Sequence, residues 1–546
     1  MTLGTDNPAD TQPLLQNTTN QGYHNVGYSS TNDSTTSLTS RDTNSVTNHD
    51  TSTPETITVD FNPDGDPDNP LDWPTPFKWA IVSMLAFMAF TVTMSCISLV
   101  PLATTIVADL SPSPTTTTSS ASVLLVTIWE LGEAAGPLLI APLSERLGRL
   151  PVFHGAHFLF IFSGILAATT TTTSSSSSSS SSPSGAVTRF ILLRMLSGLA
   201  VAANVLNPAV VGDLFARDER GAALSLTFLA PLVGGALGPA VGSAVAERWG
   251  WRAVVWMNVA LAAVGEGMFL VGFRETYKVA ILRRRKEKLE VEAEKVARAE
   301  GKGVPRFRTV FEQQEDRGGR LRDEILRPAI VLCGSGVLML LSLYGSVIFS
   351  YYYVYSTTFS TILLEVYKLS PVTVGSCFCV FSAGSVLSVC ICNRFLDRIY
   401  RRMTFLHKGV GRPEFRLPLS VVGGFLMPLA VATYGWAAQL RLSLLILLFS
   451  VCAIGAAMML ALIPVMAYVV DAFGLYAASA MTGVIVTRCL MSTFLPLTTV
   501  PLIGMFGYGW AFTVFAVGSL LLAPIPLVML RYGERWRRFS RYTREA

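Results

Sequence analysis

The sequence predicts an all-α protein that crosses a membrane about twelve times, with its spanning helices in two sets of six. Apolar side chains make up 51% of the 546 residues, charged side chains only 14%, and the mean hydropathy is +0.46. The apolar residues fall in runs of about 20, the length of a membrane-spanning helix. The strands of a spanning β-barrel are only about half as long, so a barrel is excluded.

Five regions follow one another along the chain. Residues 1–68 are predicted to be a disordered cytoplasmic tail, because their Ser, Thr, Asn and Asp side chains cannot bury enough apolar surface to fold. Residues 69–273 and 329–530 are predicted to be six-helix bundles, residues 274–328 a charged cytoplasmic linker that is partly helical, and residues 531–546 a basic cytoplasmic tail. The predicted spans are 79–103, 122–143, 151–170, 187–212, 221–246, 252–273, 329–355, 371–392, 417–438, 442–470, 475–499 and 508–530.

Basic residues are divided unevenly between the two sides of the membrane. The connections after the second, fourth and eighth spans and the C-terminal tail are rich in Arg and Lys, whereas the opposite loops carry Arg248, Arg252, Lys368 and Arg441. Loops rich in Lys and Arg stay in the cytoplasm, so both termini and the linker are predicted to be cytoplasmic. The Thr/Ser run from Thr169 to Ser182 then lies on the far side, either as filler or as a site of O-glycosylation.

Composition argues against several other classes of protein. The 42 Lys and Arg residues against 37 Asp and Glu residues are scattered over short segments, which does not favour nucleic-acid binding. The eight cysteines lie in or beside apolar runs and are expected to act as small hydrophobic side chains. Only five histidines exist, too few in the spans for a histidine-box metal centre, so neither a metal nor another cofactor is predicted.

The connection between the second and third predicted spans is a charged turn. It reads Ala141-Pro142-Leu143-Ser144-Glu145-Arg146-Leu147-Gly148-Arg149. Gly148 permits a tight turn between antiparallel helices, and Glu145, Arg146 and Arg149 can form a charge network at the cytoplasmic rim. We expect these four residues to form a cytoplasmic gate.

Two other spans carry unusual residues. The fourth holds Arg194, which needs a partner or water in the membrane unless it reaches the outer surface. The fifth holds Gly234, Gly238, Pro239 and Gly242. Glycines let two helices touch, and an internal proline kinks the axis.

These motifs resemble those of the major facilitator superfamily. The charged turn and the Arg194–Gly198 pair are similar to the superfamily's loop and span-four signatures, and residues 234–243 resemble an element that its antiporters carry. Six segments in order look like those of the fungal twelve-spanner drug:proton antiporter family: Asn69–Trp79, Trp129–Glu133, Pro137–Glu145, Arg274–Tyr277, Pro413–Pro418 and Val470–Ala480. The resemblance covers residues 69–545 and implies a major facilitator fold and a proton-coupled exporter of drugs, toxins or secondary metabolites.

A proton-coupled exporter needs a buried carboxyl group that takes up and releases a proton. Glu130 and Glu133 lie three residues apart on one face of the second predicted span, and Glu266 lies in the sixth. We expect Glu130 and Glu133 to carry the proton, with Glu266 as a further candidate and Arg194 as a counter-charge. The alternative is that one of the paired carboxyl groups only ties its span to a neighbouring helix.

The richest candidate for substrate binding is a tyrosine cluster in the seventh predicted span. Tyr344, Tyr351 and Tyr355 fall on one helical face and suit flat, apolar or cationic organic molecules, unless they belong to an interfacial belt. Asn204 and Asn207 are expected to add hydrogen bonds, unless they pair helices instead.

The sequence therefore predicts an efflux transporter that works by alternating access, and not an enzyme. A polyamine exporter and a nutrient facilitator are the alternatives, with an integral-membrane enzyme as a more remote one. The expected partners are a small organic substrate, protons and the lipid bilayer, and a monomer is expected. Asp10 with Leu14 and Leu15 is only a faint vacuolar sorting signal, so the plasma membrane is favoured over the vacuolar membrane.

Overall fold

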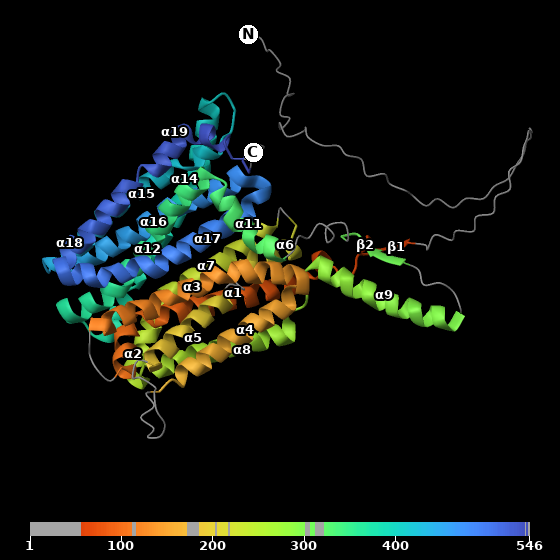
Figure 1. Cartoon of the computed structure of the whole chain (residues 1–546), viewed down its shortest axis with the longest axis horizontal. Coiled ribbons are helices and arrows are strands. Elements are labelled where there is room, and N and C mark those ends of the chain that lie inside the picture. The colour runs from red at the N-terminus through yellow and green to blue at the C-terminus, as the bar shows by residue number, and fades with distance from the viewer. Residues whose placement is uncertain are drawn as a thin grey trace, which may run out of the picture. The chain divides into compact units, whose positions relative to one another are not determined.

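A computed structural model gives the fold, which is almost entirely helical (Figure 1). It describes residues 56–111, 116–171, 185–201, 205–216, 219–300, 306–311, 321–540 and 542–543. The first 55 residues of the predicted tail, Asn204 and most of the Thr/Ser run lie outside the described residues.

The N-terminal half contains eight described α-helices and two short 3-10 turns. They are η1 (Pro70–Asp72), α1 (Thr75–Ser98), η2 (Val100–Leu102), α2 (Ala103–Leu110), α3 (Thr116–Leu147), α4 (Arg149–Ala168), α5 (Gly185–Val201), α6 (Asn207–Leu214), α7 (Arg220–Trp249) and α8 (Trp251–Gly272). Single glycines with positive φ separate α3 from α4 and α7 from α8, with φ of 96° at Gly148 and 80° at Gly250. A residue with a Cβ is strained in that conformation, so these glycines reverse the chain between antiparallel helices.

The C-terminal half follows the same pattern of long helices joined by short turns. Its elements are α11 (Leu321–Cys333), α12 (Gly336–Thr361), the π-helical turn η4 (Ile362–Val366), α13 (Pro371–Cys377), α14 (Cys379–Leu406), η5 (Pro413–Arg416), α15 (Pro418–Gln439), α16 (Leu444–Phe473), η6 (Gly474–Tyr476), α17 (Ala477–Phe494), η7 (Leu495–Thr498), α18 (Thr499–Leu522) and α19 (Ile525–Arg537). Gly507, with φ of 75°, breaks the course of α18.

Ten helical stretches among the described residues are long and apolar enough to cross a membrane. The predicted fourth span is not among them, because α5 has only 17 residues and residues 202–204, which follow it, lie outside the described part of the chain. The stretch Ala477–Arg537 has 61 residues and contains the bend at Gly507. A count of twelve requires α5 and α6 to form one crossing and Ala477–Arg537 to form two, and it stays a prediction.

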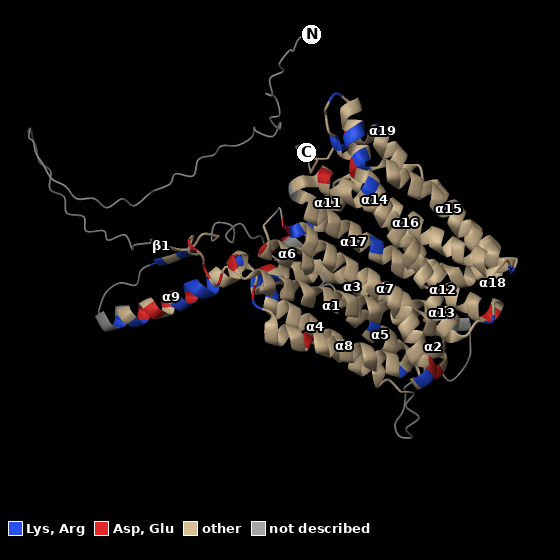
Figure 2. Ribbon diagram, turned by 180° about the vertical axis from the view of Figure 1, so that it is seen from behind, with Lys and Arg blue, Asp and Glu red and all other residues tan. Residues whose placement is uncertain are grey.

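The linker carries folded structure of its own. Strand β1 (Thr56–Val59) pairs in parallel with β2 (Arg306–Thr309), and both lie beside α9 (Lys278–Glu300), which carries mixed charges (Figure 2). Val59, Leu282 and Phe307 form a small apolar core there. The predicted tail therefore contributes a strand from residue 56 onward, because its apolar side chains find partners more than 200 residues away in the linker.

Small residues bring α7 into close contact with α1. A Cβ on Gly234 would lie 2.6 Å from the carbonyl oxygen of Phe90, and one on Gly238 would lie 3.2 Å from that of Met94. Gly242, one turn further on, packs against Ser98 in the same way. Backbone meets backbone along this line because no side chain stands between the two helices.

Two helix pairs supply most of the contact between the two halves. In one pair α3 packs against α17, and in the other α7 packs against α13. Between these pairs lies the cavity described next.

Candidate functional site between the two halves

The two halves enclose a cavity of about 380 Å³. Both halves supply its walls, which are mainly aromatic and aliphatic but include two carboxyl groups and one guanidinium group. The residues from the N-terminal half are Val92, Thr93, Cys96, Ile97, Trp129, Glu130, Glu133, Val201, Pro231, Leu232 and Gly235. Those from the C-terminal half are Phe349, Tyr352, Tyr353, Tyr355, Phe378, Phe381, Ser382, Ser385, Met458, Met459 and Arg488.

Glu130 is the most deeply buried charged group in this wall. Its side chain comes from α3, and the residue is only 3% exposed. The Tyr353 hydroxyl, on α12 of the other half, donates a 2.6 Å hydrogen bond to Glu130 Oε1. A carboxylate accepts such a bond strongly, so the bond joins the two halves at the cavity.

Glu133 lies one turn further along α3 and also has a partner in the other half. Arg488 Nη2 on α17 donates to Glu133 Oε1 at 3.3 Å, and the two side chains are 21% and 24% exposed. The guanidinium carbon of Arg488 lies 4.3 Å from the centre of the Phe349 ring, which holds the cation against an aromatic face. Both predicted proton carriers therefore line the cavity and contact the opposite half.

Arg194 takes a different position from that of a simple counter-charge. It is 4% exposed and donates to the carbonyl oxygens of Ser95 and Cys96 on α1, at 3.3 and 3.0 Å. Its guanidinium carbon lies 4.5 Å from the centre of the Trp129 ring. Arg194 thus ties α5 to α1 and is not among the residues that line the cavity, whereas Trp129, on which its guanidinium group lies, is.

The tyrosines of α12 divide between the cavity and the interior of the C-terminal half. Tyr355 lines the cavity, whereas Tyr344 donates to the Ser420 carbonyl oxygen at 2.9 Å and Tyr351 to that of Phe515 at 2.6 Å. The predicted binding face therefore packs mostly against α15 and α18. The aromatic residues of α12 that do face the cavity, besides Tyr355, are Phe349, Tyr352 and Tyr353.

Asn207, the predicted asparagine that the structure describes, is not among the residues that line the cavity. Asn207 is 4% exposed in α6, and Asn204 lies outside the described residues. Asn258 donates to the Ser98 hydroxyl at 3.0 Å and so connects α8 with α1. Asn207 and Asn258 are thus both buried inside the N-terminal half.

Glu266 lies in a separate cluster inside the N-terminal half. Its two oxygens lie 2.6 Å from His154 Nδ1 and 2.7 Å from His157 Nδ1, both on α4. Glu266 is 3% exposed and is not part of the cavity wall. The spacing of the two histidines, three residues apart on one helix, is the sequence signal for a shared partner on a neighbouring helix.

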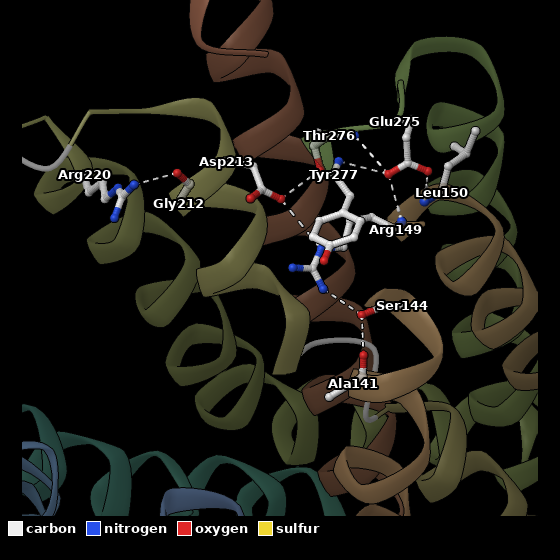
Figure 3. Close-up of polar contacts among 10 residues, drawn as sticks. All are labelled: Ala141, Ser144, Arg149, Leu150, Gly212, Asp213, Arg220, Glu275, Thr276 and Tyr277. Carbon is white, nitrogen blue, oxygen red and sulfur yellow. Dashed lines mark hydrogen bonds and ion pairs between the residues drawn. The ribbon is translucent and has the colours of Figure 1, made fainter. Parts of the chain in front are cut away.

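A second polar network lies at the α3–α4 turn (Figure 3). Arg149 Nε lies 3.6 Å from Asp213 Oδ2, and Arg149 Nη1 donates to the Ser144 hydroxyl at 2.6 Å. The Glu275 carboxylate accepts from the backbone N–H groups of Arg149 and Leu150 at 2.8 and 3.1 Å. Glu275 therefore caps the first turn of α4, a role that its position after the sixth span did not reveal.

The other predicted gate residues lie around this network. Gly148 supplies the positive φ, and a side chain there would collide with the Glu275 carboxylate. The carbonyl oxygen of Arg146 accepts a 2.8 Å hydrogen bond from Arg283 of α9, and Glu145 is exposed at the end of α3. The turn is thus connected to the linker as well as to the rest of the N-terminal half.

Asp213 is a titratable group of this network whose pKa is shifted. Burial raises its pKa to about 6, and the nearby Arg149 guanidinium and Thr276 hydroxyl only partly oppose that effect. Its carboxyl group therefore changes charge close to neutral pH, where the ion pair with Arg149 is made or lost.

The C-terminal half repeats this arrangement. Arg416, just before α15, donates to Asp471 at the end of α16 at 2.7 Å and to Asp397 of α14 at 2.8 Å. In the N-terminal half, Arg149 at the start of α4 pairs with Asp213 at the end of α6. The two halves thus carry equivalent arginine–aspartate pairs at equivalent turns.

Comparison with known proteins identifies relatives over nearly the whole described chain. The family model of the Major Facilitator Superfamily matches residues 81–496. The MFS transporter cpaT of Aspergillus oryzae is 30% identical, over 90% of this chain and 94% of the relative. The efflux pump radE of Floropilus chiversii is 29% identical, over 89% of this chain and 85% of the relative.

Solved structures show the same fold at low sequence identity. The xylose transporter XylE from E. coli, in a partially occluded inward open conformation, has a TM-score of 0.60 at 17% identity and covers 84% of this chain and 98% of its own. A crystal structure of a D-xylose-proton symporter has a TM-score of 0.62 at 17% identity and covers 87% of this chain and 100% of its own. These likenesses concern the fold alone.

Proposed function

Because the chain belongs to the major facilitator superfamily, we propose that it is a proton-coupled efflux transporter that exports an organic molecule in exchange for protons. It is a multi-pass membrane transporter and not an enzyme. The proposal includes twelve spans, cytoplasmic termini and alternating access, in which the two halves rock about the cavity between them.

The observation that carries the proposal is the position of the two glutamates. Glu130 and Glu133 belong to one half and take their partners, Tyr353 and Arg488, from the other. A proton on either carboxyl group removes its negative charge and weakens its bond across the boundary. Protonation is therefore linked to the contact between the halves, which is what coupling a proton to a conformational change requires.

The cavity wall supports an aromatic or largely apolar substrate. Flat aromatic faces are provided by Trp129, Phe349, Tyr352 and Phe381, and Met458 adds a flexible thioether side chain. Drugs, toxins and secondary metabolites fit such a wall better than a sugar, which needs many hydrogen-bonding partners. A polyamine is the second candidate, because two carboxyl groups and one guanidinium group leave the wall with excess negative charge.

The glycine line of α7 supports movement of the bundle. Gly234, Gly238 and Gly242 let α7 lie directly on α1, while Pro239 interrupts its hydrogen-bond ladder. Gly375 of α13 in turn packs against Pro239 and Ser243. A helix that touches both its own half and the other suits a rocking motion between the halves. We place the protein, as a monomer, in the plasma membrane.

Everted membrane vesicles test the direction and the coupling together. A fluorescent aromatic cation is added outside vesicles that are acid inside, so that export appears as accumulation in the lumen. We expect accumulation that stops when nigericin removes the pH gradient. Accumulation that persists without the gradient would contradict proton coupling, and faster release of probe preloaded into the lumen, without accumulation, would support nutrient uptake instead.

A further inference from the structure

Helix α19 and the turn that follows it at residues 538–539 carry two different stripes on their exposed side. Arg531, Arg535 and Arg538 follow one another at steps of four and three residues and are all exposed. Tyr532, Trp536 and Phe539, each one residue further on, form a neighbouring stripe and are 42%, 38% and 83% exposed. Arginines beside exposed aromatic rings are typical of a helix that lies at the boundary between lipid headgroups and acyl chains.

The charge of this surface is only partly neutralised. Arg538 pairs with Glu534 at 2.7 Å, and Glu534 also pairs with Arg412 at 2.5 Å. For Arg531 and Arg535 the described part of the chain shows no acidic partner, and the Arg531 guanidinium lies only near the Tyr532 ring. The surface therefore keeps a positive charge that suits a phosphate group.

A groove begins beside the aromatic stripe. Trp536 and Phe539 form one wall of a depression of about 430 Å³, and Gly336 and Leu340 at the start of α12 form the other. The Ser540 hydroxyl donates to the Gly334 carbonyl oxygen at 3.2 Å, which fixes the end of α19 to the turn before α12. This depression shares Met339 with a second one.

The second depression extends the groove along α12 and α17. It has a volume of about 390 Å³ and runs between Leu343 on α12 and Leu490 on α17, both about 40% exposed. At its base the hydroxyl groups of Ser342 and Thr487 bond to each other, so the groove surface itself is almost wholly apolar. The groove thus leads from Trp536 and Phe539, next to the arginines in the sequence, along α12 as far as Ser346.

We propose that this groove and the arginines of α19 bind one anionic phospholipid from the leaflet on the side of the C-terminus. The phosphate and an anionic headgroup lie at Arg531 and Arg535, and an acyl chain lies in the groove past Met339. The surrounding bilayer is the source of the ligand, since α12 and α17 belong to stretches that can cross a membrane. The positive charge at the mouth selects an anionic lipid over a zwitterionic one.

Native mass spectrometry of the purified full chain, with added phosphatidylserine or phosphatidylcholine, tests whether the arginines select an anionic lipid. The wild type is expected to retain one phosphatidylserine in preference to phosphatidylcholine. Each arginine near an anionic surface contributes roughly fivefold, so R531Q/R535Q should bind phosphatidylserine about 25-fold more weakly. The matched control R398Q/R402Q removes two exposed arginines elsewhere on the same side and should bind as the wild type does.

The groove is tested by filling it. Gly336 lines the first depression, and a Cβ added there meets no atom within 4 Å, so we expect the ring of G336F to occupy that depression. G336F should lose retained phosphatidylserine, whereas G504F, at another glycine with open space, should keep it. Equal retention of the two lipids by the wild type, or equal binding by R531Q/R535Q and its control, would overturn the proposal.

Discussion

The Tyr353 hydroxyl of the C-terminal half donates a 2.6 Å hydrogen bond to the Glu130 carboxylate of the N-terminal half. Both residues are less than 5% exposed, so the bond lies in a region from which bulk water is excluded. A hydrogen bond to a charged group in such a place contributes about 1.5 to 3 kcal/mol. The bond holds the two halves together only while the carboxyl group can accept it.

Removal of this hydroxyl should uncouple export from the proton gradient. Y353F keeps the ring but loses the donor, so we expect the initial rate of export to fall about tenfold or more at a fixed gradient. Tyr352 lines the same cavity, and no hydrogen bond from its hydroxyl to a carboxyl group is described, so Y352F is the control. Equal rates for the two variants would show that the Tyr353–Glu130 bond plays no part.

The Glu133–Arg488 pair should behave as a unit in stability. E133Q leaves the Arg488 guanidinium group without its carboxylate partner, and R488Q leaves the Glu133 carboxylate without its cation. Each variant should lower the free energy of unfolding by about 1 to 3 kcal/mol. The double variant removes both charges and should be more stable than the two single losses predict. Thermal unfolding of all four proteins in one detergent measures this, and strict additivity would contradict the pairing.

Asp213 should make stability depend on pH. Its pKa is about 6 in the folded protein because of burial, against about 3.9 in an unfolded chain, so the folded state binds more protons between these values. The contribution is fully present below pH 4 and is lost as the pH rises through 6, which amounts to about 3 kcal/mol. D213N should remove this loss, whereas D109N, outside the buried network, should leave it unchanged.

The glycine line of α7 should tolerate no added methyl group. A Cβ at Gly234 would lie 2.6 Å from a backbone oxygen that has no room to move, so G234A should destabilise the protein by about 1 to 3 kcal/mol. Gly267 also lies in a helix but faces open space, and G267A should be neutral or stabilising. Similar melting temperatures for both variants would contradict the close packing of α7 on α1.

Features set by local sequence could be predicted, including the major facilitator fold, which is confirmed. The apolar runs give the long helices, and Gly148 gives the turn between α3 and α4. The placement of Glu130 and Glu133 on one face of a helix follows from their spacing of three residues. Each of these depends on residues that are neighbours in the chain.

Features that depend on distant packing could not be predicted in the same way. Helical spacing finds the tyrosines of α12 but does not reveal that Tyr344 and Tyr351 turn toward α15 and α18. It also does not pair Glu266 with His157, which lies 109 residues away. Likewise, a strand of four residues at Thr56 is stable only because Phe307 and Leu282 cover it.

The central claim is that Glu130 couples export to the proton gradient. It is tested most directly by measuring export and substrate exchange by E130Q in the same proteoliposomes. We predict that E130Q loses uphill export driven by a pH gradient but still exchanges labelled for unlabelled substrate when no gradient is present, because its cavity and its two-state motion remain. The control variant E247Q, at an exposed position near the end of α7, should retain both uphill export and substrate exchange. Uphill export by E130Q at the wild-type rate would contradict the account.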